Sequence, residues 1–124
     1  MNRRRSLFLC ALLVAGCGTP SVSATSVDLN EFSVIPATTR LAAGQVELTA
    51  HNSGEFPHTL VVSRTDGTVV AGTELIDTGE TARLAVTLTA GSYMFTCRIV
   101  SQMDTGELVD HYERGMVARV EVTA

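Results

Sequence analysis

Two histidines, one cysteine and one methionine are the residues of this sequence best suited to bind a soft metal ion. His58 opens a predicted strand, Cys97 ends another, and His111 and Met116 flank four residues that include a glycine. Thiolate and thioether sulfur are soft donors, and imidazole suits both oxidation states of copper. The set therefore predicts one copper ion, Cu(I) or Cu(II), with three strong ligands and the methionine sulfur as a weak axial one.

Each of these residues taken alone has a simpler interpretation. His58 precedes Leu60 and Val62 with a period of two, so it is expected to face inward with them. A buried, hydrogen-bonded core histidine satisfies that pattern without a metal. Cys97 is equally compatible with the role of a small buried hydrophobic residue. The metal interpretation is favoured because all four donors occur together.

The first sixteen residues have the features of an export signal. Arg3, Arg4 and Arg5 give a positive start, and residues 7–15 form an apolar run too short to span a bilayer. The following segment, Leu13-Val14-Ala15-Gly16-Cys17, resembles a bacterial lipobox, which implies cleavage before Cys17 and attachment of lipid to it. The alternative is an ordinary signal peptide with a chance cysteine. We expect an exported lipoprotein on the extracytoplasmic side of the cell membrane.

The charge balance limits the classes of partner. All nine basic residues are arginine, and removing Arg3, Arg4 and Arg5 leaves six against thirteen acidic residues, a net charge of −7. Such a surface argues against nucleic acid, which basic patches bind. It would also repel an anionic membrane, so attachment to a membrane should be covalent.

Without Cys10 and the lipidated Cys17, Cys97 is the only thiol of the mature domain. A single thiol in an oxidising compartment is open to oxidation, so its presence indicates a specific role.

The remaining chain is predicted to be a tether followed by one all-β domain. Residues 17–26 are small and polar after Cys17, a composition typical of a flexible linker, and residues 27–124 contain no second boundary. Apolar residues alternate with polar ones in several short segments separated by glycine-containing turns, which predicts an antiparallel sandwich or barrel. The inward-facing residues of these segments are Val46, Leu48, Ala50; Leu84, Val86, Leu88; Tyr93, Phe95, Cys97; and Val120, Val122.

Three motifs in this order resemble those of the plastocyanin- and amicyanin-type cupredoxins, over about Val27 to Val122. They are Asn52, Gly54, Pro57 and His58; the strand Gly91, Tyr93, Phe95 and Cys97; and the loop His111, Gly115 and Met116. The resemblance implies a cupredoxin-like antiparallel Greek-key β-sandwich. It also implies a type 1 copper site with His58, Cys97, His111 and Met116 as ligands, and electron transfer as the role.

The chain departs from that family in one segment. Thirteen residues, 98–110, separate Cys97 from His111, where the familiar members have only a few. Two apolar-containing arms around Asp104-Thr105-Gly106, a turn-like tripeptide, predict a hairpin that places His111 nearly opposite Cys97. Its apolar residues with a charged rim also predict a docking surface for a partner. The residues of that surface are Ile99, Val100, Leu108 and Val109.

The sequence alone leaves three functions open. The chain is a one-electron carrier, a lipoprotein that captures or delivers copper, or a metal-free interaction module of the same fold. The corresponding partner is a redox protein or a copper donor or acceptor. No Ser-His-Asp arrangement, phosphate-binding loop or paired carboxylate motif stands out, so we do not expect an enzyme. Met103 is read as a surface residue, with a role in copper capture as the alternative.

Overall fold

The computed structural model describes residues 23–124, which form eleven strands and no helix. The predicted signal peptide, Cys17 and residues 18–22 lie outside the described residues. The strands are β1 (Ser23–Asn30), β2 (Ser33–Pro36), β3 (Arg40–Ala42), β4 (Gly44–Asn52), β5 (Val61–Arg64), β6 (Val69–Gly72), β7 (Thr81–Leu88), β8 (Gly91–Thr96), β9 (Val100–Gln102), β10 (Leu108–Asp110) and β11 (Val117–Thr123).

The first strand begins earlier than the composition indicates. Residues 23–26, predicted to lie in the tether, pair with residues 46–49 of β4, and Thr25 is buried. They therefore belong to the domain. Small polar residues are typical of linkers, but a neighbouring strand can supply hydrogen bonds that fix them in a sheet.

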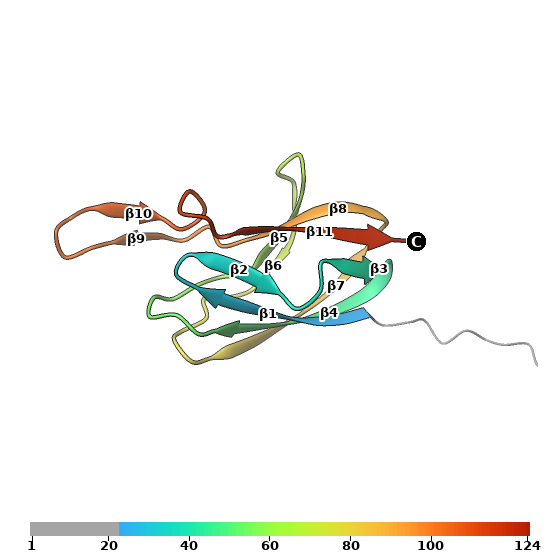
Figure 1. The fold of residues 1–124 in the computed structure, drawn as a ribbon, viewed down its shortest axis with the longest axis horizontal. Helices are drawn as coiled ribbons and strands as arrows, with labels where there is room; N and C mark the ends of the chain where they lie inside the picture. Colours follow the sequence, from blue (N-terminus) through green and yellow to red (C-terminus); the bar gives the residue numbers. More distant parts are fainter. Residues whose placement is uncertain (1–22) are drawn as a thin grey trace, which may run out of the picture.

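Two sheets pack face to face and make the sandwich that the alternation predicts. One has the order β2-β1-β4-β7 and the other β3-β11-β8-β5-β6, and they form the two layers of Figure 1. Most neighbours are antiparallel, but β1 runs parallel to β4 and β3 runs parallel to β11. The all-β fold class is confirmed. The parallel pairs could not be predicted, because a strand's own pattern carries no information about its neighbour's direction.

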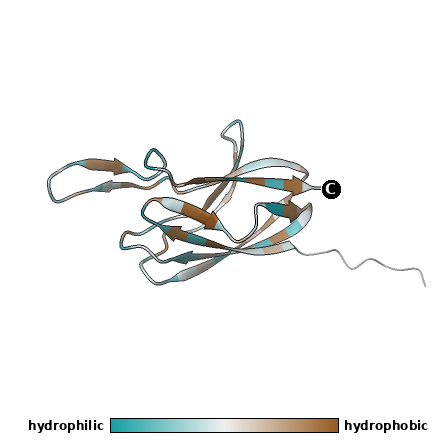
Figure 2. Cartoon of the chain, viewed as in Figure 1, coloured by the Kyte–Doolittle hydropathy of each residue, from teal (hydrophilic) through white to brown (hydrophobic). Residues whose placement is uncertain are grey.

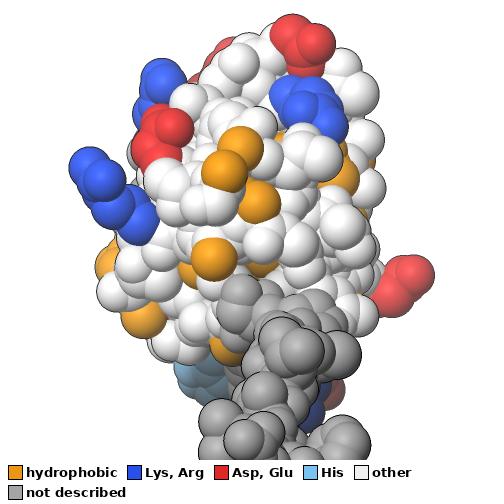
Figure 3. Space-filling model, turned by 90° about the vertical axis from the view of Figure 1, so that its right-hand side faces the viewer, with side chains coloured by type: hydrophobic (Ala, Val, Ile, Leu, Met, Phe, Trp, Pro, Cys, Tyr) orange, Lys and Arg blue, Asp and Glu red, His pale blue; other side chains and the backbone are white. Residues whose placement is uncertain are grey.

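The core lies between the sheets and consists of the alternate residues of each strand. Val46, Leu48 and Ala50 of β4 face Tyr93 and Phe95 of β8 across it, and all are at most 1% exposed. His58, Leu60 and Val62 are also fully buried, which confirms that they share one inward face. Figure 2 shows hydrophobic stretches on the strands of both layers. On the end of the molecule seen in Figure 3, hydrophobic side chains are scattered among backbone atoms and other side chains.

The segment between Cys97 and His111 forms the predicted hairpin. β9 and β10 pair antiparallel as a separate two-stranded sheet that extends beyond one end of the sandwich (Figure 1). The backbone N–H of Gly106 donates to Met103 O, and Met103 N–H donates to Glu107 O, so the chain turns at the expected tripeptide. Within residues 23–124 the protein has no helix with the length and apolar character needed to cross a membrane.

A buried asparagine joins β4 to the loop that carries His58. The Asn52 side chain is fully buried and donates to the carbonyl oxygens of Phe56 (2.8 Å) and Ile76 (2.9 Å). Its own oxygen accepts from the backbone N–H of Gly54 at 2.9 Å. These bonds hold the turn after β4 in one conformation, because buried backbone groups must be paired.

We expect Asn52→Ala to destabilise the domain, because it leaves Phe56 O and Gly54 N–H without a partner, whereas Ile76 O still accepts from His58 N–H. One unpaired buried group costs about 1–3 kcal/mol, so the free energy of unfolding should fall by roughly 2 kcal/mol or more in a denaturant titration. His51→Ala is the matched control, since the His51 side chain is exposed and bonds only to the Thr81 hydroxyl on the surface. Equal stability of the two variants would contradict this account.

Candidate metal centre

Three of the four predicted ligands meet in one buried cluster. His58 Nδ1 lies 3.1 Å from His111 Nδ1, and Cys97 Sγ lies 3.8 Å and 3.7 Å from these two atoms. The donor atoms of this cluster all lie within 4.8 Å of one another. All three residues and Met116 have no exposed surface.

The cluster is formed where strands of the five-stranded sheet begin or end. His58 precedes β5 and bonds to Ile76 through both backbone groups, at 3.1 Å and 2.8 Å. Cys97 directly follows β8, and its N–H donates to the carbonyl oxygen of Met116, which directly precedes β11. Met116 N–H in turn donates to His111 O. The backbone thus fixes the positions of cysteine, methionine and second histidine relative to one another.

Glu31 holds the outer nitrogen of His58. Its Oε1 lies 2.9 Å from His58 Nε2, and the carboxylate also accepts from the backbone N–H groups of Glu55 and Phe56. Burial alone would raise the pKa of Glu31, but the bonds from Phe56, Glu55 and His58 hold the pKa below its usual value. An ionised carboxylate can only accept, so His58 carries its proton on Nε2 and presents the Nδ1 lone pair inward.

Gly54 leaves the space that the carboxylate of Glu31 occupies. A Cβ at this position would overlap the Glu31 carboxylate oxygens. The glycine of the first motif is thus required by the close approach of a side chain from the β1–β2 turn, and its conformational freedom plays no part in this requirement.

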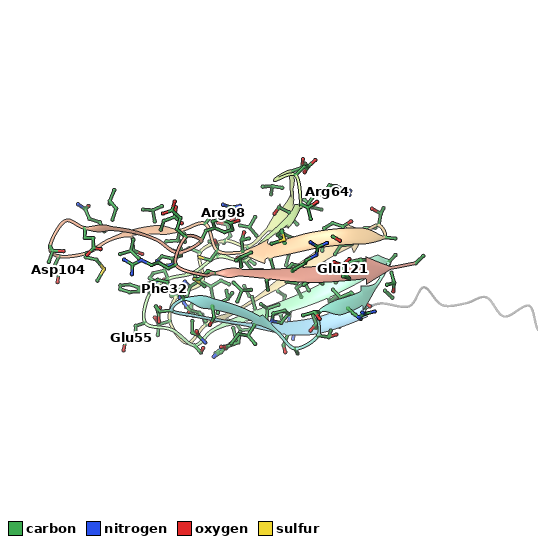
Figure 4. All side chains as sticks on the ribbon, turned by 45° about the horizontal axis from the view of Figure 1, so that its top comes forward. Phe32, Glu55, Arg64, Arg98, Asp104 and Glu121 are labelled. Atoms are coloured by element: carbon green, nitrogen blue, oxygen red, sulfur yellow. The ribbon has the colours of Figure 1, made fainter. Side chains whose placement is uncertain are left out.

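Ser101 holds the outer nitrogen of His111. Its Oγ lies 2.7 Å from His111 Nε2, and Phe32 and Phe56 pack around the ring with centroid distances of 5.2 Å and 6.1 Å. Burial, and then the neighbouring His58, lower the pKa of His111 and favour its neutral form. Figure 4 shows Phe32 at the end of the sandwich from which the hairpin extends, with Glu55 at the same end.

The hairpin positions His111, although not directly opposite Cys97. His111 N–H donates to Ile99 O, so the histidine continues the ladder one step beyond the pair Asp110 and Val100.

The predicted apolar surface is divided between the two faces of the hairpin. Val100 and Leu108 are 54% and 66% exposed, whereas Val109 is 6% exposed. The docking role of the hairpin stays a prediction. Met103 is 37% exposed, consistent with a surface residue.

Glu31 and Ser101 are the site residues that sequence analysis missed. Glu31 lies 27 positions from His58 in an unremarkable turn, and no local pattern connects them. Ser101 had a weak signal: within the predicted hairpin, it falls on the same face as His111. The sulfur also has a neighbour not predicted, since Thr59 N–H points to Cys97 Sγ at 3.5 Å.

The donor set fits a copper ion. Separations of 3.1 to 3.8 Å are those expected of nitrogen and sulfur atoms that share one ion at about 2.0–2.3 Å. Two imidazoles and a thiolate with a methionine nearby are the donors of a type 1 copper site. Both outer nitrogens have hydrogen-bond partners, Glu31 and Ser101, which orient the two rings with Nδ1 toward the cluster.

The chain belongs to the cupredoxin family: a family model described as a cupredoxin-like domain matches residues 6–109. That match ends two residues before His111, so the placement of His111 and Met116 rests on the structure. A comparison with curated proteins finds no match.

Several solved structures share the fold. Auracyanin A, a "blue" copper protein from Chloroflexus aurantiacus, aligns with a TM-score of 0.63 at 15% identity, over 83% of this chain and 100% of its own. Reduced auracyanin from Roseiflexus castenholzii gives 0.58 at 15% identity, over 86% and 100%. A purple cupredoxin from Nitrosopumilus maritimus gives 0.50 at 18% identity, over 79% and 98%. At these identities the likeness establishes the fold.

We expect Glu31→Gln to weaken the metal centre, because it removes the charged acceptor that holds the Nε2 proton of His58 and so directs Nδ1 inward. Losing such an outer partner typically lowers metal affinity about 10–100-fold, which competition with a copper chelator would measure. Glu55→Gln is the matched control, since this neighbouring carboxylate is exposed and has no hydrogen bond within the described part of the chain. If both variants bind copper equally, Glu31 has no such role.

Proposed function

We propose that this chain is a one-electron carrier with a type 1 copper site, in which His58, Cys97, His111 and Met116 are the ligands. The observation that carries the proposal is the buried cluster of two imidazole nitrogens and one thiol sulfur, held through its backbone to Met116. Copper bound by such donors can alternate between Cu(I) and Cu(II) and so accept and release single electrons.

The residues around the cluster support this use. Electron transfer is fast when the donor atoms move little between oxidation states, and three of the four donors here have a hydrogen-bond partner. Glu31 orients His58, Ser101 orients His111, and Thr59 N–H points to Cys97 Sγ. Full burial of the four side chains also keeps water from competing for the metal.

The same features favour a carrier over a copper-delivery protein. Delivery requires that an incoming ligand reach the ion and displace its donors one at a time. None of the four side chains is exposed, and both histidines are held through their outer nitrogens. Such an arrangement retains an ion, and the partner that it fits is a redox protein that needs no contact with the metal.

We expect Cys97→Ser to abolish any intense visible absorption with Cu(II), because thiolate-to-copper charge transfer needs this sulfur. Serine is nearly isosteric, so the circular dichroism spectrum of the sandwich should be unchanged. Met94→Leu is the control: Met94 lies on β8 out of phase with Tyr93 and Phe95, and its loss should leave the band intact. A coloured Cys97→Ser protein would exclude this site.

The proposal extends to the location of the protein. The basic start, the short apolar run and the lipobox-like segment support export and lipid attachment at Cys17. Residues 18–22 would span at most about 18 Å when fully extended, so a lipid on Cys17 would keep the domain close to the membrane.

The direction of β1 would then turn the metal centre away from the membrane. β1 starts at Ser23 and ends beside Glu31, and its eight residues cover roughly 25 Å. In Figure 1 the start of β1 and the projecting hairpin lie at opposite ends of the sandwich. The redox partner that this orientation fits is a water-soluble protein or a domain standing well above the bilayer.

We expect Cys17→Ser to abolish lipid modification, so that the protein is released or remains uncleaved. Metabolic labelling with a fatty acid, followed by membrane fractionation, would measure this. Cys10→Ser, within the apolar run, is the control and should remain labelled. A wild-type protein that fractionates as free and starts at a residue other than Cys17 would contradict the lipoprotein interpretation.

A further inference from the structure

The two histidines of the cluster face each other through the same ring atom. Their Nδ1 atoms lie 3.1 Å apart, which is hydrogen-bonding distance. Two nitrogen lone pairs at this separation repel, so without a metal ion one of the two Nδ1 atoms must carry a proton. The question is which histidine carries it.

Glu31 decides this question in favour of His111. The carboxylate can only accept, so the Nε2 atom of His58, 2.9 Å away, carries the proton of that ring. A neutral His58 then offers a lone pair at Nδ1. His111 must therefore donate from its own Nδ1, which leaves a lone pair at its Nε2. The hydroxyl of Ser101, 2.7 Å from this Nε2, is then the donor.

Metal ligation requires the reverse arrangement on His111. A ligating Nδ1 carries no proton, so the proton of the neutral ring must be on Nε2, and Ser101 Oγ must accept it. A hydroxyl can do both, because it has one rotatable O–H and two lone pairs. A carboxylate could only accept and a backbone N–H could only donate. The Ser101 hydroxyl has no other hydrogen bond within residues 23–124, so it is free to turn.

We propose that Ser101 is a positioning residue that reverses its hydrogen bond when the metal binds, so that His111 changes tautomer while His58 does not. The inference rests on the proposed copper function. The proton count is balanced: His111 stays neutral, since one proton leaves Nδ1 and one is taken up at Nε2 by exchange with water. The only proton released from the site is that of the Cys97 thiol as it becomes a thiolate.

The direct test is the tautomeric state of both histidines, read from long-range 1H–15N spectra at pH 8, where histidines are ordinarily neutral. In the metal-free protein we expect a proton on Nδ1 of His111 and on Nε2 of His58. In the protein loaded with diamagnetic Cu(I) we expect both rings to carry it on Nε2. A proton on Nε2 of His111 in the metal-free protein would overturn the reversal.

Variants of the hairpin test the hydroxyl itself. Ser101→Ala removes the acceptor for the Nε2 proton, so Cu(I) affinity should fall about 10–100-fold in competition with a chelator. Ser101→Thr keeps a hydroxyl and should restore both the affinity and the change of tautomer. Gln102→Ala, at an exposed neighbouring position of β9, is the control and should match the wild type. A Ser101→Ala protein with wild-type affinity would overturn the proposal.

These outcomes separate the inference from the function on which it rests. A wild-type protein that does not bind copper would contradict the proposed function, while the metal-free spectrum would still support or overturn the assignment of His111. A protein that binds copper normally, with His111 protonated on Nε2 in both forms, would leave the function intact and overturn the role of Ser101.

Discussion

Two imidazole rings buried with their Nδ1 atoms facing one another are the constraint on which the rest of this structure depends. Each outer nitrogen must be satisfied inside the protein, because an unpaired buried polar group costs about 1–3 kcal/mol. Glu31 satisfies one and Ser101 the other. They come from segments far apart in the chain, the β1–β2 turn and the hairpin. The sandwich must therefore bring both segments to the same end as Cys97 and Met116.

The same constraint explains the role of the inserted segment, residues 98–110. A short connection between Cys97 and His111 would leave the second ring without the strand that carries Ser101 and Ile99. Here the hairpin supplies a backbone acceptor for His111 N–H and a hydroxyl for His111 Nε2. The consequence is a closed centre: its histidines, cysteine and methionine have no exposed surface. The two partners also differ in charge, since a carboxylate stands behind His58 and a neutral hydroxyl behind His111.

Much of the fold and of the site could be predicted from local patterns. The period of two in residues 46–50, 58–62 and 93–97 identified the inward faces correctly, because alternation in a strand is a property of the backbone. The hairpin turn at residues 104–106 was predicted for a similar reason, since turn-forming residues separated two apolar arms. The parallel partners of β1 and β3 were not predicted. The tether boundary was also placed too late, because Ser23 to Ser26 are held by β4 and not by their own preferences.

The sequence by itself determined which donor atoms are available and, for His58 and Cys97, which inward face of the adjoining strand each one shares. Residue types and their spacing are enough for that, because chemistry belongs to the side chain and alternation to the strand. Only the tertiary structure decided how those donors are oriented. Glu31 acts on His58 across 27 positions of sequence and Ser101 acts on His111 across 10, while Gly54 leaves the space that the Glu31 carboxylate occupies. Hydrogen bonds of that kind depend on how the two sheets and the hairpin are placed relative to one another. No periodicity along the chain encodes this placement.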